Sequence, residues 1–96
     1  MEFLLIAYDG ADEAALDRRM SVREKHLAYA RGLYKEGRLL KGGALLNEEG
    51  KMIGSAAIYQ AESTEELQKT IDEDPYTING VWVNVTIQPF RLANLD

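Results

Sequence analysis

The only histidine of the chain, His26, lies in a stretch whose spacing predicts a helix. Arg23 precedes it by three positions, and Ala30 and Leu33 follow it at spacings of four and three. A helix therefore places these residues on one side, which is the side expected to face the core. A neutral imidazole can accept a proton, and a guanidinium can hold an anionic oxygen. The pair predicts proton transfer on an anionic molecule.

A carboxylate, Asp74, continues the inward side of a second predicted helix over 63–74, after Leu67, Thr70 and Ile71. The negative end of the helix dipole disfavours a carboxylate in a last turn, so another interaction is expected to hold it. Asp74 could cap the turn in "DPY" by accepting backbone N–H groups two residues further on. It could instead meet His26. The sequence leaves both interpretations open.

Plainer interpretations exist for the other two residues as well. His26 could be a core histidine with a satisfied hydrogen bond, and Arg23 could be a surface arginine whose stem packs while its head reaches solvent. Taken singly, each plain arrangement is common. All three side chains nevertheless occupy positions that the local sequence preferences of helices and turns do not explain, which favours one shared site.

Six elements are expected, in the order β-α-β-β-α-β. Hydrophobic periodicity and turn residues predict strands over 2–8, 38–46, 51–60 and 80–90, and helices over 22–36 and 63–74. Residues 9–20 are expected to form a loop with one or two helical turns. Ser21 and Ser63, each followed by a glutamate three residues later, fit capping boxes, and Gly37 fits a left-handed C-cap.

This order is that of the ferredoxin-like α+β fold. Right-handed crossovers give a four-stranded antiparallel sheet of order 4-1-3-2, with both helices on one face. In this topology the start of the first helix and the end of the second share one edge, so His26 and Asp74 should meet although 48 positions separate them. A helix that starts near Val22 also places His26 close to the positive end, which favours the neutral imidazole.

The other face of the sheet has no helix left to cover it. The first strand is apolar at nearly every position, and the last strand alternates Val81, Val83, Val85 and Ile87 with Trp82 on the opposite face. Because a large apolar face is rarely left to solvent, a second copy is expected to pack sheet to sheet in a C2 homodimer.

Composition limits the other partners. Ninety-six residues with 46% hydrophobic content suit a single domain over 1–96. A net charge of -5 with scattered Lys and Arg argues against nucleic acid, and the absence of cysteine with one histidine argues against disulfides and a protein-built zinc site. The first apolar run is too short for a signal or spanning segment. We expect a cytoplasmic protein that needs neither metal nor cofactor and binds no membrane.

Two stretches, "RRMSVREKHLAYARGLYKEGRLLKGGALL" and "DEDPYTINGVWVNVTIQPF", resemble the YciI-like (YCII-related) family. The similarity runs from the first strand to residues 89–90. The arginine-containing stretch that leads to a histidine, and the "DPY" after the second helix, are both present. The sequence departs from the family at "REKH", where many relatives have a proline, and at "GGALL", where many have Gly-Pro. The second departure implies an altered pocket floor.

The resemblance implies a dimeric ferredoxin-like α+β barrel with a His–Asp dyad. His26 and Asp74 match the dyad, and Arg23, Ser21 and Tyr76 match neighbouring positions of the motif. Related barrels include enzymes that isomerise, eliminate from or oxidise small ring compounds without a metal.

Together these observations predict a small metal-free enzyme that isomerises, or eliminates a group from, a small anionic or phenolic metabolite. His26 is the expected general base and acid, oriented by Asp74. Arg23, with Arg19, is expected to hold a carboxylate or phenolate oxygen, and Tyr76 to shape the pocket or donate a hydrogen bond. A non-catalytic binding or sensing barrel, or a purely structural subunit, would use the same residue types, and the sequence leaves these alternatives open.

Overall fold

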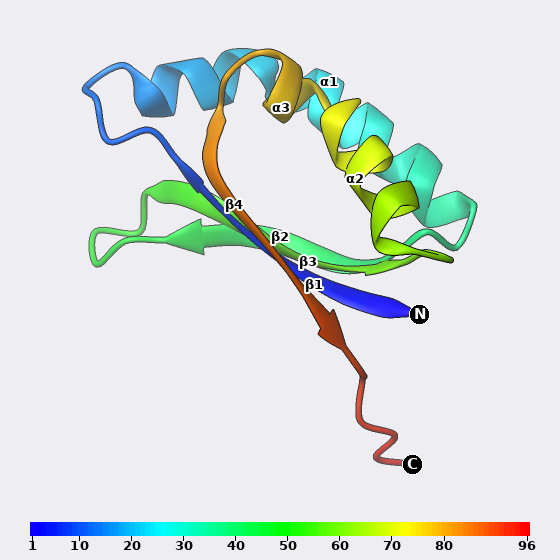
Figure 1. The fold of residues 1–96 in the computed structure, drawn as a ribbon. Helices are drawn as coiled ribbons and strands as arrows, with labels where there is room; N and C mark the ends of the chain where they lie inside the picture. The colour runs from blue at the N-terminus through cyan, green and yellow to red at the C-terminus, as the bar shows by residue number, and fades with distance from the viewer.

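The computed structural model describes all 96 residues as four strands and three helices (Figure 1). In chain order the elements are β1 (Glu2–Asp9), α1 (Ala15–Lys35), β2 (Leu39–Leu46), β3 (Met52–Gln60), α2 (Thr64–Asp72), α3 (Pro75–Ile78) and β4 (Trp82–Phe90). None of the helices combines the length and the apolar character that a membrane crossing requires.

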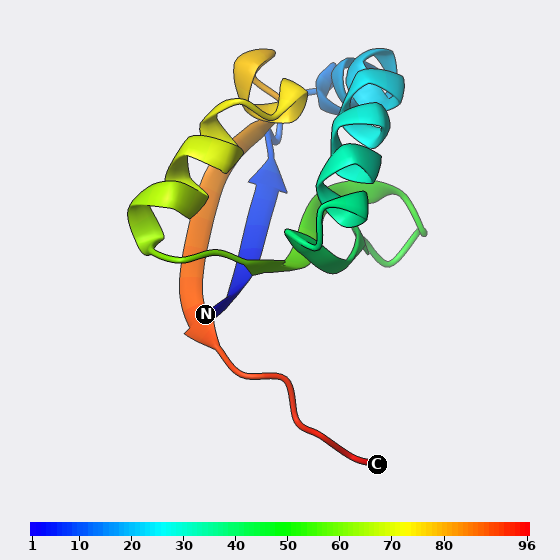
Figure 2. The same ribbon diagram turned by 90° about the vertical axis from the view of Figure 1, so that its right-hand side faces the viewer.

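The strands form one antiparallel sheet of order β2-β3-β1-β4, which confirms the predicted order and the ferredoxin-like α+β fold. The helices lie on one face of this sheet (Figure 2). Phe3 and Leu5 of the central strand β1 are fully buried beneath them and pack with Leu33 of α1 and with Leu67 and Ile71 of α2. The core therefore lies between the helices and the sheet.

Helix α1 begins at Ala15, seven residues before the predicted start. Its N-cap, Ala14, makes no side-chain capping bond, but Ala15, Arg19 and Val22 are buried along one side. Such burial supplies most of the stability of a helix in a protein, so no capping signal marks this start. The predicted capping box at Ser21 is therefore wrong.

Ser21 lies inside α1, where its hydroxyl donates a 2.8 Å hydrogen bond to the Arg18 carbonyl. His26 is eleven residues past Ala15. Because the dipole effect fades beyond the first turn, the expected influence of a positive helix end on His26 is also wrong. Gly37 has a φ of 75°, as a left-handed C-cap requires.

The chain between α2 and β4 differs from the prediction at one point. Ser63 caps α2 as expected, because its hydroxyl accepts a 3.1 Å bond from the Glu66 amide. However, α2 ends at Asp72, and a separate short helix, α3, follows. Asp74 is the N-cap of α3, with Pro75 in its first turn. An aspartate is favoured at this position, so it is not the misplaced carboxylate of a helix C-terminus.

A β-bulge interrupts the pairing of β4 with β1 near the start of β4. Ala7 of β1 lies opposite Val85, and Asp9 lies opposite Trp82, so β4 has one more residue than β1 across this interval. Directly opposed residues share a face, and Ala7 and Asp9 both face the helices. Trp82 therefore points to the helix side together with Val85, and its predicted outward orientation is wrong. The bulge causes this by resetting the alternation.

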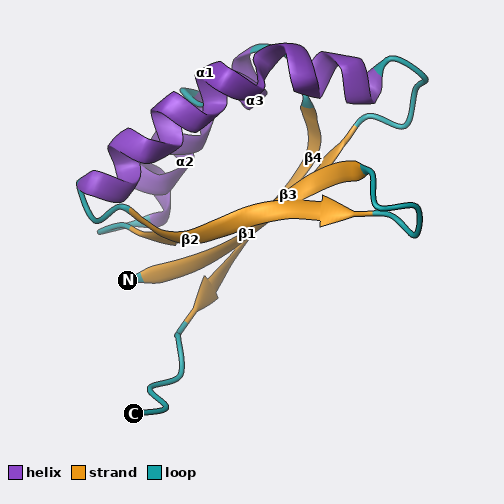
Figure 3. Cartoon of the chain, turned by 180° about the vertical axis from the view of Figure 1, so that it is seen from behind, coloured by secondary structure: helices purple, strands orange, loops and turns teal.

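The second face of the sheet carries no covering element (Figure 3). Leu4, Ile6 and Ile58 on this face are half-buried, and Tyr8 is 47% exposed. The residues after β4 extend away from the sheet. A single chain thus leaves an apolar surface open.

Gly54 provides a test of the sheet packing. A Cβ atom there would clash with the Ala7 carbonyl oxygen on the paired strand β1, whereas a Cβ at Gly32 of α1 meets nothing within 4 Å. We expect Gly54→Ala to lower the free energy of unfolding by about 2 kcal/mol or more, because backbone has to move. Gly32→Ala, the control, should not lower it, because Gly32 is exposed in α1 and alanine is favoured over glycine inside a helix. Urea unfolding of the two variants measures the difference, and equal stabilities would contradict the strand register.

Candidate functional site

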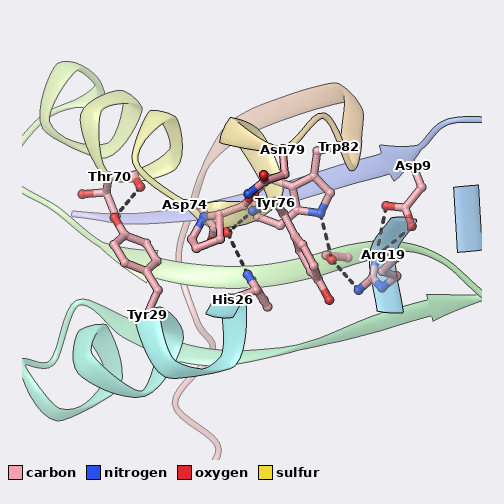
Figure 4. A network of polar contacts seen from close by, with 11 residues as sticks. Asp9, Arg19, His26, Tyr29, Thr70, Asp74, Tyr76, Asn79 and Trp82 are labelled. Carbon is pink, nitrogen blue, oxygen red and sulfur yellow. Dashed lines mark hydrogen bonds and ion pairs between the residues drawn. The ribbon is translucent and has the colours of Figure 1, made fainter. Parts of the chain in front are cut away.

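His26 of α1 and Asp74 at the start of α3 are in direct contact (Figure 4). The imidazole Nδ1 lies 2.8 Å from the Asp74 Oδ1. The Asp74 side chain is 2% exposed and the His26 side chain 16%. The same carboxylate oxygen accepts a 2.9 Å bond from the Tyr76 amide. Both interpretations of Asp74 thus hold together, since it caps a turn and contacts the histidine.

The contact with Asp74 determines which ring nitrogen of His26 carries the proton. An ionised carboxylate only accepts hydrogen bonds, so Nδ1 is the donor. In the neutral ring Nε2 then keeps a free lone pair. Because His26 lines a cavity, this arrangement suits a base that acts on a bound molecule.

Two buried aromatic side chains hold the imidazole plane. The Tyr76 ring stacks on His26 with centroids 3.8 Å apart and planes at 9°. Trp82 meets the imidazole edge-on at 5.7 Å and Tyr76 at 5.6 Å. Trp82 occupies this place because the bulge turns it toward the helices. The imidazole is therefore restrained on two sides as well as by Asp74.

Arg19 lines the cavity and belongs to a buried polar network. Its Nη1 donates to both carboxylate oxygens of Asp9, at 3.0 and 3.1 Å, and its Nη2 donates to the Ser55 hydroxyl at 2.9 Å. The Trp82 indole N–H donates to the same hydroxyl at 3.1 Å. The Arg19 guanidinium also lies 4.7 Å from the centre of the Tyr76 ring. The network thus connects β1, α1, β3 and β4 behind Tyr76.

Two tyrosines near the dyad have altered acidity. Burial raises the pKa of the Tyr76 hydroxyl, while Arg19 and Arg23 act in the opposite direction. Burial, with the nearby charges of Glu73 and Asp74, raises the pKa of Tyr29 to about 12. Both phenols therefore remain protonated near neutral pH and can donate hydrogen bonds. Tyr29 does so to the Thr70 carbonyl at 2.6 Å, which connects α1 to α2 beside Asp74.

The cavity has a volume of about 460 Å³ and lies between α1 and the strands β2 and β3. Arg19, His26, Tyr76 and Trp82 line one end of it, and small residues of β2 and β3 form its floor: Gly42, Gly43, Ala44, Ala56 and Ala57. The structure gathers no group of three or more His, Asp or Glu side chains that could hold a metal ion.

The structure places the six predicted site residues differently with respect to the cavity. His26, Asp74 and Tyr76 contact one another, and Arg23 lines the same cavity, half-buried and without an ion pair. Arg19 also lines the cavity, but Asp9 already occupies its guanidinium. Ser21 is exposed and does not line the cavity.

Sequence reasoning missed three members of the site: Asp9, Ser55 and Trp82. Asp9 and Ser55 were detectable in principle as polar residues at the end of one apolar strand and inside another. Trp82 was not detectable, because its face depends on the bulge.

The YCII-related domain family model matches residues 1–91. The chain belongs to the YCII-related family. Protein YciI of Escherichia coli O6:H1 is 39% identical over 97 residues, which span 95% of this chain and 97% of that protein. The similarity thus covers nearly the full length of the relative.

Solved structures extend the comparison of this YCII-related chain. The 5-chloro-2-hydroxyhydroquinone dehydrochlorinase (TftG) of Burkholderia phenoliruptrix, in complex with 2,5-dihydroxybenzoquinone, superimposes with a TM-score of 0.83 at 26% identity and covers 97% of this chain and 96% of its own. A dimeric ferredoxin-like protein of unknown function from Jannaschia has a TM-score of 0.52 at 16% identity over 95% of this chain and 98% of its own. The second likeness shows the fold alone.

The effect of Asp74 on His26 can be measured directly. In Asp74→Asn the amide oxygen can still cap α3, so the fold should survive, but the negative charge that stabilises the imidazolium is lost. We expect the imidazole nitrogen signals of His26, followed by NMR at one fixed pH, to shift, because the contact of Nδ1 with a charged carboxylate is lost.

Asp72→Asn is the matched control, because Asp72 is exposed at the end of α2 and bonds to Gln68. This variant should give the His26 signals of the unmodified protein. An Asp74→Asn variant with unchanged His26 signals would show that the two side chains do not interact in solution.

Proposed function

We propose that this YCII-related protein is an enzyme that uses a His26–Asp74 dyad for proton transfer on a small anionic or phenolic metabolite, by isomerisation or elimination. The observation that supports it is the 2.8 Å contact of Nδ1 with a buried carboxylate, which leaves Nε2 free beside a cavity of about 460 Å³. The chain has no cysteine, and the one serine that lines the cavity, Ser55, bonds to Arg19 and Trp82 rather than to His26. This favours proton transfer over hydrolysis by a serine or cysteine nucleophile.

In this proposal His26 removes a proton from the ligand through Nε2 and returns it, or gives it to a leaving group, in a later step. Asp74 holds the ring in the required tautomer and stabilises the imidazolium that forms. Tyr76 keeps the ring plane fixed, and its protonated hydroxyl is available to the ligand as a donor.

In this proposal Arg23, rather than Arg19, binds the anionic group of the ligand. Arg23 lines the cavity without an internal carboxylate partner, so its charge is available to a ligand oxygen. The charge of Arg19 is satisfied by Asp9, and its role in the proposal is to support the Tyr76 ring, whose centre lies 4.7 Å from the guanidinium. Ser21 receives no role, because it is exposed outside the cavity.

The comparison with TftG supports the class of ligand. That protein acts on a chlorinated hydroxyhydroquinone and was solved with a dihydroxybenzoquinone, both of which are small oxygenated rings. Loss of chloride from such a ring is an elimination, which requires a base for the proton and a path for the leaving group. The dyad of this chain supplies such a base.

A catalytic role for His26 predicts turnover that depends on this residue. The protein would be incubated with 5-chloro-2-hydroxyhydroquinone and with a pool of phenolic and carboxylic metabolites, and mass spectrometry would follow the loss of each compound. We expect at least one compound to be consumed, and His26→Gln to slow its loss by about 10²- to 10⁴-fold.

Arg23→Gln should mainly weaken capture, which appears as a higher KM. Lys25→Gln removes one positive charge from an exposed position of α1 outside the cavity and should leave turnover unchanged. Compounds that are retained but never converted, at any pH, would instead indicate a binding or sensing barrel.

We also propose that the protein is a homodimer joined through the uncovered face of the sheet. This face presents Leu4, Ile6 and Tyr8, and the similar Jannaschia protein is described as dimeric. Burial of an apolar face is the usual driving force for such an interface, and C2 symmetry is its commonest form.

Sedimentation should give about twice the 10.8 kDa chain mass at micromolar concentration. Ile6→Glu should shift the protein to monomers, because it buries a charge in the interface. Met20→Glu adds the same charge at an exposed position of α1 and should not. A monomeric unmodified protein would contradict the proposal.

A further inference from the structure

Arg31 lies at the end of the cavity remote from the dyad. Apart from Arg19 and His26, the α1 residues that line the cavity follow one another at helical spacing: Arg23, Leu27, Ala30, Arg31 and Tyr34. Arg23 and Arg31 are eight positions apart, which corresponds to about 12 Å along the helix axis. The cavity thus has a guanidinium near each end.

The charges around the cavity have one sign. Four of the 11 Lys and Arg residues line it and none of the 16 Asp and Glu residues does, although the chain has a net charge of -5. Arg19 is paired with Asp9, and Lys41 lies opposite Ile58 on the uncovered face of the sheet. Arg23 and Arg31 form no ion pair within the chain. These two arginines are therefore the cations available to a ligand.

The middle of the cavity is apolar and wide. Leu27 and Ala30 of α1 lie across it from the glycine and alanine floor formed by β2 and β3. A cavity of about 150 Å³ is enough for a benzene ring. The volume of about 460 Å³ found here therefore leaves room for a ring and a substantial extension.

We propose that Arg31 forms a second anion subsite, and that the natural ligand is an elongated molecule with two acidic groups. Its reactive end lies at His26 and Arg23, its apolar middle lies over the glycine–alanine floor, and a carboxylate at its far end binds Arg31. This inference rests on the proposed use of the cavity as a ligand site, and it adds the length and charge of the ligand.

Two rigid probes test the subsite. Biphenyl-4,4′-dicarboxylate carries an acid at each end, and biphenyl-4-carboxylate has the same rings with only one. Their dissociation constants are measured by NMR titration of the full chain at low salt. The symmetric diacid can bind in two equivalent orientations, which gives it a statistical factor of two over the monoacid. An exposed ion pair with Arg31 adds a modest gain, so we expect the diacid to bind roughly three- to tenfold more tightly.

Arg31→Gln should reduce this advantage to about the statistical factor of two while leaving the monoacid unaffected. Arg31→Lys, which keeps the charge, should retain most of it. Lys25→Gln is the matched control, because it removes the same charge from an exposed position of α1 outside the cavity, and it should keep the full advantage.

Equal binding of the two acids by the unmodified protein, or an advantage that survives in Arg31→Gln, would overturn the subsite. So would a failure of both acids to bind. None of these results depends on turnover by His26, so the subsite can fail while the proposed reaction stands. The reaction can likewise fail while the charge and length selectivity of the cavity is confirmed.

Discussion

The carboxylate of Asp74 joins the backbone of one helix to the side chain of another. Its Oδ1 accepts from the Tyr76 amide at 2.9 Å and contacts the His26 Nδ1 at 2.8 Å, and the side chain is almost completely buried. A buried charge of this kind is costly unless hydrogen bonds compensate it. Because one bond comes from α3 and the other from α1, the cost is offset only when the two helices are correctly placed. The position of the imidazole beside the cavity follows from this requirement.

A second buried ion pair, between Arg19 and Asp9, lies near the dyad and helps to position it through packing. Removing Arg19 and Asp9 from water is expensive, and close bonds from the guanidinium to both carboxylate oxygens, with a third to Ser55, offset part of that cost. The Nε of Arg19 is nevertheless buried without an acceptor in the chain. A buried ion pair is therefore weak evidence for stability. Its geometry here holds the guanidinium beside the Tyr76 ring, which in turn stacks on His26.

The distribution of charge distinguishes the cavity from the rest of the molecule. The chain is acidic overall, yet no carboxylate lines the cavity and two unpaired arginines do. Low-dielectric walls concentrate such a field, so an anion is attracted to the cavity even though the whole protein repels it. The glycine and alanine floor opposite α1 adds space without adding charge. Selection by charge and selection by length therefore arise from different elements, the first from α1 and the second from β2 and β3.

Periodicity and turn residues by themselves determined most of the fold. The apolar run of β1, the capping of α2 by Ser63 and the left-handed Gly37 are local properties, so the element order and the strand order could be derived from them. The meeting of His26 and Asp74 followed from that order, although the sequence could not decide between a turn cap and a partner for the histidine. The structure shows that one oxygen serves both.

Only the tertiary structure decided the features that depend on pairing between distant segments. The start of α1 at Ala15 rests on burial against the rest of the protein, which no capping residue announces. The inward direction of Trp82 depends on a bulge relative to β1, because one added residue reverses every side chain beyond it. The recruitment of Asp9 and Ser55 by Arg19 likewise joins three elements that are remote in sequence. Local sequence patterns carry no information about these contacts, since each residue obtains its partner only when the sheet and the helices have packed.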